Sequence, residues 1–101
     1  MKHCMLSLDL ADAANDNRTD FYNVLDADDW VKLAGVDTVW KKSFDDTFLN
    51  PSIQRRILTA LKEAAEAARV RRVTFAAQIG NNEAQTGQIV KVSGGFEGSF
   101  N

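Results

Sequence analysis

The sequence predicts an α+β domain in which two helices cover one face of an antiparallel sheet. Several short segments alternate apolar and polar residues, which is typical of strands with one buried face. Two longer segments repeat apolar residues every three or four positions, as amphipathic helices do. The predicted order is strand, helix, one or two strands, helix, strand, strand. With 101 residues, 45% of them apolar, the chain can bury one core and is too short for a second domain.

The first strand is predicted over residues 3–10, where every second residue is apolar: Cys4, Leu6, Leu8 and Leu10. Residues 11–17 are short and polar and predict a turn. Thr19 or Asp20 can then act as the N-cap of a helix. The apolar face of this helix is formed by Phe21, Val24 and Leu25. Because the acidic residues 26–29 interrupt the apolar period, we expect the helix to end near them.

Residues 30–34 are open to two interpretations. They alternate weakly and can form a short strand, followed by a turn at Gly35 and a longer strand over residues 36–44. The inward face of the longer strand would consist of Val36, Thr38, Trp40 and Phe44. Alternatively, a single helix runs over residues 20–34 and is capped by Gly35.

The second helix has clear signals at its start. Asn50 is a suitable N-cap, and Pro51, the single proline, suits the first helical position because its missing N–H would have no partner there. The apolar stripe of the helix includes Ile53, Ile57 and Leu61. We expect this helix to end near Arg69.

The last part of the chain predicts a hairpin and a tail. Residues 70–79 alternate as a strand, residues 80–82 form a turn, and residues 87–93 form the return strand. Residues 94–101 are glycine-rich and are expected to be frayed in an isolated chain. Their two phenylalanines suggest that the tail docks on another surface, such as a second copy of the chain. The chain is therefore divided into one domain, residues 1–93, and this C-terminal tail.

Charge is distributed unevenly along the chain. The net charge is −2, but residues 1–50 contain five basic and ten acidic side chains, whereas residues 51–101 contain seven basic and four acidic ones. Such a molecule can present its basic half to nucleic acid or its acidic half to a basic protein. Solvated faces of opposite sign are an equally good explanation.

Cysteine content and hydropathy indicate the compartment. Cys4 is the only cysteine, which excludes a disulfide framework and fits a reducing cytoplasm. The N-terminus carries a charge too soon after its apolar run for a signal peptide, and no apolar segment approaches the ~20 residues that cross a bilayer. We therefore expect a cytoplasmic protein without membrane contact. His3 and Cys4 would point to opposite faces of a strand, which excludes a catalytic pair.

Three segments resemble one family of small ferredoxin-like proteins. Residues 6–10 place Asp9 at the end of a first strand, as in the family that includes CRISPR-associated Cas-two adaptation subunits and VapD-type RNases. Residues 30–40 are similar to the second and third strands of relatives outside CRISPR loci. Residues 53–75 resemble the second helix and fourth strand. The resemblance covers about residues 2–80 and implies a ferredoxin-like two-layer sandwich.

The resemblance also implies a homodimer associated with nucleic acid, in which Asp9 corresponds to the metal-linked aspartate of the family. The open sheet faces and C-terminal strands would contribute to the dimer interface. One carboxylate is not enough to hold Mg²⁺, but a two-fold axis near the first strand would bring two Asp9 side chains together. Such a metal could activate water against a phosphodiester, as in a metal-dependent nuclease. The alternative is a strand-end aspartate that accepts a hydrogen bond from the backbone.

Five basic residues are candidate contacts to nucleic-acid phosphates: Lys41, Lys42, Arg69, Arg71 and Arg72. Arg71 and Arg72 are neighbours in a predicted strand, so their side chains would point to opposite faces unless a bulge intervenes. In that arrangement they do not form one patch. The alternative role is protection of a strand edge against pairing with other chains.

The acidic stretch between Asp12 and Asp29 gives a second hypothesis from a different class. The aspartates lack the register of a calcium-binding loop: with Asp9 as the first ligand, Ala11 and Ala13 stand where oxygen ligands would be needed. The stretch can instead form an acidic surface for a basic protein partner, as in an antitoxin or an inhibitor of a defence system. The residues proposed for that contact are Asp26, Asp28 and Asp29. Solvated loops rich in capping aspartates are the simpler explanation.

Overall fold

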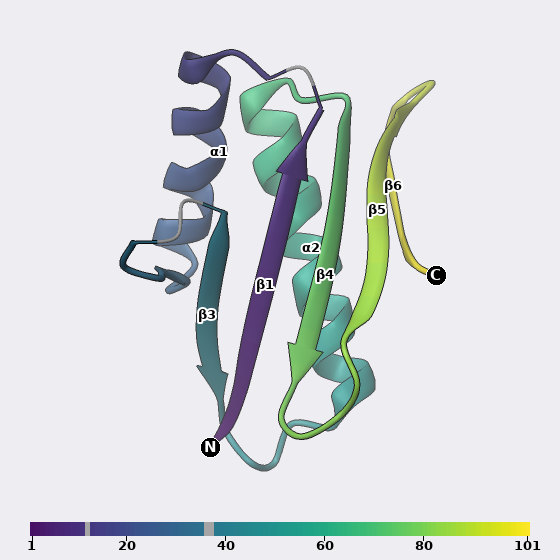
Figure 1. The fold of residues 1–101 in the computed structure, drawn as a ribbon. Helices are drawn as coiled ribbons and strands as arrows, with labels where there is room; N and C mark the ends of the chain where they lie inside the picture. Colours follow the sequence, from purple (N-terminus) through teal and green to yellow (C-terminus); the bar gives the residue numbers. More distant parts are fainter. Residues whose placement is uncertain (12, 36–37) are drawn as a thin grey trace.

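The computed structural model describes residues 1–11, 13–35 and 38–101, which form a six-stranded antiparallel sheet and two helices. In chain order the elements are β1 (Lys2–Leu10), α1 (Asn15–Ala27), β2 (Val31–Lys32), β3 (Val39–Phe44), α2 (Asn50–Ala68), β4 (Arg72–Ile79), β5 (Gln85–Val92) and β6 (Gly95–Phe100). The strands lie in the order β2-β3-β1-β4-β5-β6, and both helices cover the same face of the sheet (Figure 1). The predicted α+β class is confirmed, and the sheet and the helices form two layers.

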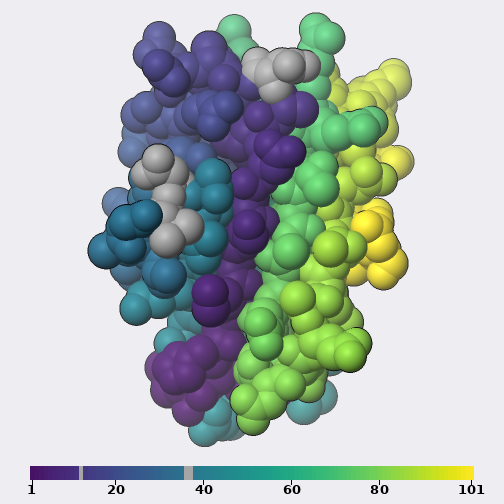
Figure 2. Space-filling view, viewed as in Figure 1, coloured from purple at the N-terminus to yellow at the C-terminus, as the bar shows by residue number. Residues whose placement is uncertain are grey.

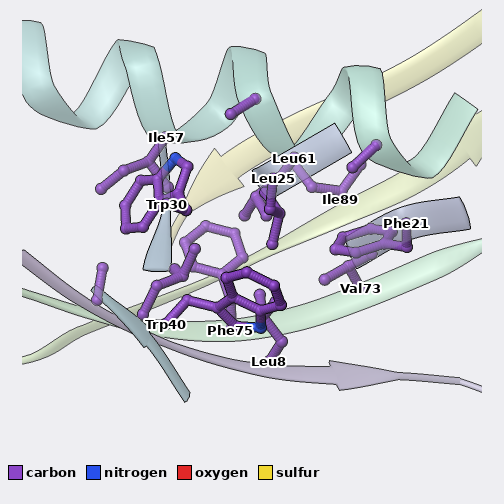
Figure 3. Close-up of a cluster of buried hydrophobic side chains, with 14 of the residues drawn as sticks. Leu8, Phe21, Leu25, Trp30, Trp40, Ile57, Leu61, Val73, Phe75 and Ile89 are labelled. Carbon is purple, nitrogen blue, oxygen red and sulfur yellow. The ribbon is translucent and has the colours of Figure 1, made fainter. Parts of the chain in front are cut away.

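Strand β1 lies inside the sheet, between β3 and β4. Its four alternating apolar residues, at positions 4, 6, 8 and 10, are all buried against the helices, as predicted. Figure 3 shows Leu8 of β1 and Phe75 of β4 in the same apolar layer as Leu25 of α1 and Leu61 of α2. The intervening residues of β1 face the opposite, open side of the sheet, and Asp9 is one of them.

Helix α1 begins earlier than predicted. It starts at Asn15, after Ala14 as N-cap, and Thr19 lies inside the helix, where its Oγ1 donates to the Asn15 carbonyl (3.1 Å). A contact that is distant in the sequence accounts for the additional turn: Nδ2 of Asn17 donates to the carbonyl of Ala68, at the end of α2 (2.6 Å). The prediction of a start at Thr19 or Asp20 is therefore wrong. The predicted end is confirmed, because the helix ends at Ala27.

Residues 30–34 follow the first of the two interpretations, and the helix over residues 20–34 does not form. Asp29 has a positive φ of 66°, and the chain then turns Trp30 into the core with 1% of its surface exposed. Strand β2 is limited to two residues. Strand β3 begins at Val39, and Trp40 and Phe44 are buried as predicted, whereas Val36 lies outside the described residues.

Helix α2 matches its prediction except for the cap. Leu49 is the N-cap and Asn50 is already helical; the Asn50 side chain instead accepts a hydrogen bond from Nζ of Lys2 (3.1 Å). The predicted stripe of isoleucines and leucine is fully buried. The helix ends at Ala68, and Arg69 follows in the left-handed conformation, with φ of 57°. In the part of the chain that the structure describes, no helix is long and apolar enough to cross a membrane.

The last six strand residues, Gly95–Phe100, form β6 instead of a frayed tail. β6 pairs with β5, and the ring of Phe100 packs edge-on against Phe75, with 5.2 Å between the centroids. A Cβ atom at Gly98 would lie 2.5 Å from Cδ1 of Ile89. Glycine at position 98 therefore allows β6 to lie close to the core, where the sequence pattern indicated flexibility.

Candidate functional site

Three of the five predicted phosphate contacts line one pocket. This surface pocket, of about 560 Å³, lies where β1 ends and β4 begins, near the top of Figure 1. Its lining consists of Ala11, Ala13, Asn17, Arg69, Val70, Arg71 and Arg72. We call it the arginine pocket.

The backbone after α2 explains why the three arginines meet. The backbone of Arg69 adopts the left-handed conformation, so the chain turns sharply as it leaves the helix. The N–H of Val70 then donates to the carbonyl of Ala65 (3.1 Å), and its side chain is buried. Strand β4 begins only at Arg72, so Arg71 precedes the regular alternation. Arg71 and Arg72 both line the pocket, and because Arg71 lies before the regular strand, the expectation that strand alternation separates the two residues does not apply to this pair.

Hydrogen bonds from three neighbouring elements hold this segment in place. The N–H of Lys91, in β5, donates to the carbonyl of Arg71 (2.8 Å). The N–H of Ala11, directly after β1, donates to the carbonyl of Arg72 (3.2 Å), and Asn17 of α1 holds the end of α2 as described above. The arginines are thus carried by a fixed backbone, although their side chains are exposed. Preorganisation of this kind lowers the entropy cost of binding a ligand.

No ion pair within the described residues involves an arginine of the pocket. The ion pairs among the described residues join the N-terminus to Asp46 and Lys42 to Asp28. A guanidinium group stays charged at any physiological pH. Three positive charges therefore share one pocket, which favours an anionic ligand.

The two lysines predicted to contact phosphate lie apart from the pocket. Lys41 is exposed on β3, opposite Met5 of β1, and faces the open side of the sheet. Lys42 faces the helix side, where its Nζ donates to the carbonyl of Asp28 (2.5 Å) and lies 5.4 Å from the centroid of the Phe44 ring. Lys42 is therefore engaged within the fold, whereas Lys41 faces solvent.

Asp9 stands on the open face, exposed, opposite Thr74 of β4. By alternation along β4, Arg72 lies on the same face, two positions from Thr74. Among the described residues no group of three His, Cys, Asp or Glu side chains could hold a metal ion. The Mg²⁺ site predicted at Asp9 stays a prediction.

The three aspartates of the alternative hypothesis lie together at the end of α1. All three are exposed, and Asp28 in addition accepts a hydrogen bond from Nε1 of Trp30 (3.2 Å) and pairs with Lys42 (3.4 Å). Asp12, the first residue of that acidic stretch, lies outside the described residues. Asn17 of α1 lines the arginine pocket and Asp26 lies nine positions later in the same helix, so at 1.5 Å per residue the two are about 14 Å apart along the helix.

Neither Cys4 nor His3 forms a nucleophilic site. Burial raises the pKa of the Cys4 thiol to about 11, so the thiol is neutral at pH 7. His3 is on the opposite face, as predicted, where its Nδ1 lies 2.9 Å from Oγ of Ser43 on the paired strand β3. Asn17 is the pocket residue that sequence reasoning missed, because its pattern indicated only a turn.

Comparison of the chain with protein-family models, with curated proteins and with solved structures finds no match. The arginine pocket combines positive charge with a backbone held by hydrogen bonds from neighbouring elements.

Proposed function

We propose that this chain is a nucleic-acid-binding protein that contacts phosphate groups through the arginine pocket. The observation that carries the proposal is that Arg69, Arg71 and Arg72 line one pocket without a paired carboxylate among the described residues. Guanidinium groups bind phosphate oxygens through two parallel hydrogen bonds, which neither lysine nor a neutral side chain can do. A polyanion also relieves the mutual repulsion of the three charges.

The open face of the sheet provides a path for a strand that leaves the pocket. β1, β4 and β5 lie exposed beside one another on this face (Figure 2). Lys41 is opposite Met5, four positions from Asp9 along β1, which corresponds to about 13 Å at ~3.3 Å per residue. Lys41 would therefore contact a phosphate beyond the one that occupies the pocket.

We also propose that the fold is ferredoxin-like. The order β1-α1-β2-β3-α2-β4, with these strands arranged as β2-β3-β1-β4, supports this proposal. β5 and β6 then extend the sheet beyond β4. A homodimer, which the resemblance to Cas-two and VapD-type proteins implies, belongs to the same proposal. Its support is that β6 forms one edge of the described sheet and so presents backbone groups for pairing.

The proposal is tested with the double variant Arg71→Gln/Arg72→Gln. Arg69 is left unchanged, because it caps α2 in the left-handed conformation. Fluorescence anisotropy with labelled single-stranded RNA and DNA measures the dissociation constant over a range of salt concentrations. We expect the affinity to fall about tenfold or more. The slope of log K against log salt should become shallower by about 1.4, because each lost phosphate contact contributes ~0.7 for single strands.

A matched control removes the same charge elsewhere. Arg55 and Arg56 lie on α2 outside the arginine pocket; Arg55 donates to Oγ of Ser52 (3.1 Å), and Arg56 lies over the Phe48 ring. The variant Arg55→Gln/Arg56→Gln should keep most of the affinity. Equal losses in both variants would mean that net charge alone governs binding, and a folded wild-type protein that binds neither RNA nor DNA would refute the proposal.

A further inference from the structure

We infer that the arginine pocket selects a terminal phosphate of a nucleic-acid strand, a phosphomonoester, over an internal phosphodiester. This inference rests on the proposed function, because it specifies which phosphate the pocket binds.

The number of donors matches a phosphomonoester. A terminal phosphate has three non-ester oxygens and a charge of about −1.5 to −2 at pH 7, whereas an internal phosphodiester has two such oxygens and a charge of −1. Arg69, Arg71 and Arg72 provide three guanidinium groups, and each can donate two hydrogen bonds to phosphate oxygens. A phosphodiester would leave part of this donor set without an acceptor.

The position of the pocket also favours a strand end. The pocket lies at the end of the sheet, where Ala11 follows the last residue of β1. A terminal phosphate enters such a site from one direction, whereas an internal phosphate requires the strand to enter and to leave. The proposed path over the open face toward Lys41 accommodates a strand that leaves the pocket on one side only.

The apolar side of the pocket fits the first nucleotide. Ala11, Ala13 and Val70 line the pocket together with the arginines, and Val70 and Ala13 pack with the core. Small apolar side chains accommodate the flat surface of a sugar or base next to the phosphate. A volume of about 560 Å³ leaves space for more than the phosphate group alone.

The experiment compares four single-stranded oligonucleotides of one sequence on the wild-type protein. The first has no terminal phosphate, the second has a 5′-phosphate, and the third has a 3′-phosphate. The fourth is lengthened by one nucleotide at the end whose phosphate binds best, so that the same phosphate becomes an internal phosphodiester. We expect the preferred terminal phosphate to raise the affinity about tenfold, and the added nucleotide to remove this gain.

The arginine variants separate the inference from the proposed function. Arg71→Gln/Arg72→Gln should lose the preference for a terminal phosphate, and Arg55→Gln/Arg56→Gln should keep it; circular dichroism establishes that both are folded. If all four oligonucleotides bind the wild type equally and the pocket variant weakens them all, the inference is overturned and the proposed function stands. If none binds the wild type, both are overturned. The comparison on the wild type alone decides the inference even if the pocket variant does not fold.

Discussion

The contacts of Asp28 in the structure differ from the role that the sequence predicts for it. The sequence places it in an acidic surface, but its carboxylate accepts a hydrogen bond from Nε1 of Trp30 and pairs with Nζ of Lys42. Trp30 is buried, so Asp28→Ala removes the acceptor of an indole N–H at the edge of the core. We expect the free energy of unfolding to fall by about 1–3 kcal/mol. Urea denaturation followed by tryptophan fluorescence measures this change.

Asp26→Ala is the matched control for that substitution. Asp26 is exposed in the last turn of α1, where a negative charge is unfavourable because it faces the negative end of the helix dipole. Its removal should change the free energy of unfolding by less than about 0.5 kcal/mol. A similar loss in both variants would show that the charge of this region, and not the contact with Trp30, is what stabilises the fold. A variant that neutralises Asp26, Asp28 and Asp29 together would change the stability of the fold as well as any binding to a basic protein partner, so the two effects could not be separated.

At the scale of the elements, the sequence predicts what depends on local periodicity. The buried faces of β1, α2 and β4 follow from alternation or helical spacing, and these predictions are confirmed. The predictions are wrong where an element depends on a contact between residues that are far apart in the sequence. The first turn of α1 depends on the bond from Asn17 to Ala68, and β6 depends on the close approach that Gly98 allows. Neither contact can be predicted from the local pattern of apolar and polar residues.

Helix α2 offers a quantitative test at this scale. Ile57 has no exposed surface and lies in the centre of the stripe that packs on the sheet. Ile57→Ala should lower the free energy of unfolding by about 2–5 kcal/mol, because it removes buried methyl groups and leaves a cavity. Chemical denaturation of the variant and of Leu58→Ala provides the comparison. Leu58 is only partly buried, so its loss should be smaller, and the reverse order would mean that the helix packs through another face.

At the scale of the whole molecule, the fold gathers three basic residues of the second half of the chain in one pocket. The sequence names Arg69, Arg71 and Arg72 as phosphate contacts, but it does not predict that they share a pocket. That arrangement requires the left-handed Arg69 and the hydrogen bonds from β1 and β5. Lys42 is no longer a candidate phosphate contact, because its Nζ donates a hydrogen bond to the carbonyl of Asp28, 14 positions earlier in the chain. Helix α1 keeps the acidic cluster at the opposite end from the arginine pocket, so a nucleic-acid strand can approach a basic region of an acidic protein.

Asp9 decides between the two nucleic-acid hypotheses, binding alone and metal-dependent cleavage. Its exposed carboxylate lies on the open face, on the same side of the sheet as Arg72, where the bound strand is proposed to run. A solvent-exposed like charge several ångströms away costs about 0.5 kcal/mol, so Asp9→Asn should raise the affinity for single-stranded RNA or DNA about twofold. If the protein binds without a metal ion at Asp9, the gain should be the same in Mg²⁺ and in a chelator. Anisotropy in both buffers measures the gain, and gel analysis of the same samples detects cleavage. Cleavage that requires Mg²⁺ and is abolished by Asp9→Asn would instead assign Asp9 to a metal site completed by a second copy, and light scattering would then have to give twice the mass of one chain.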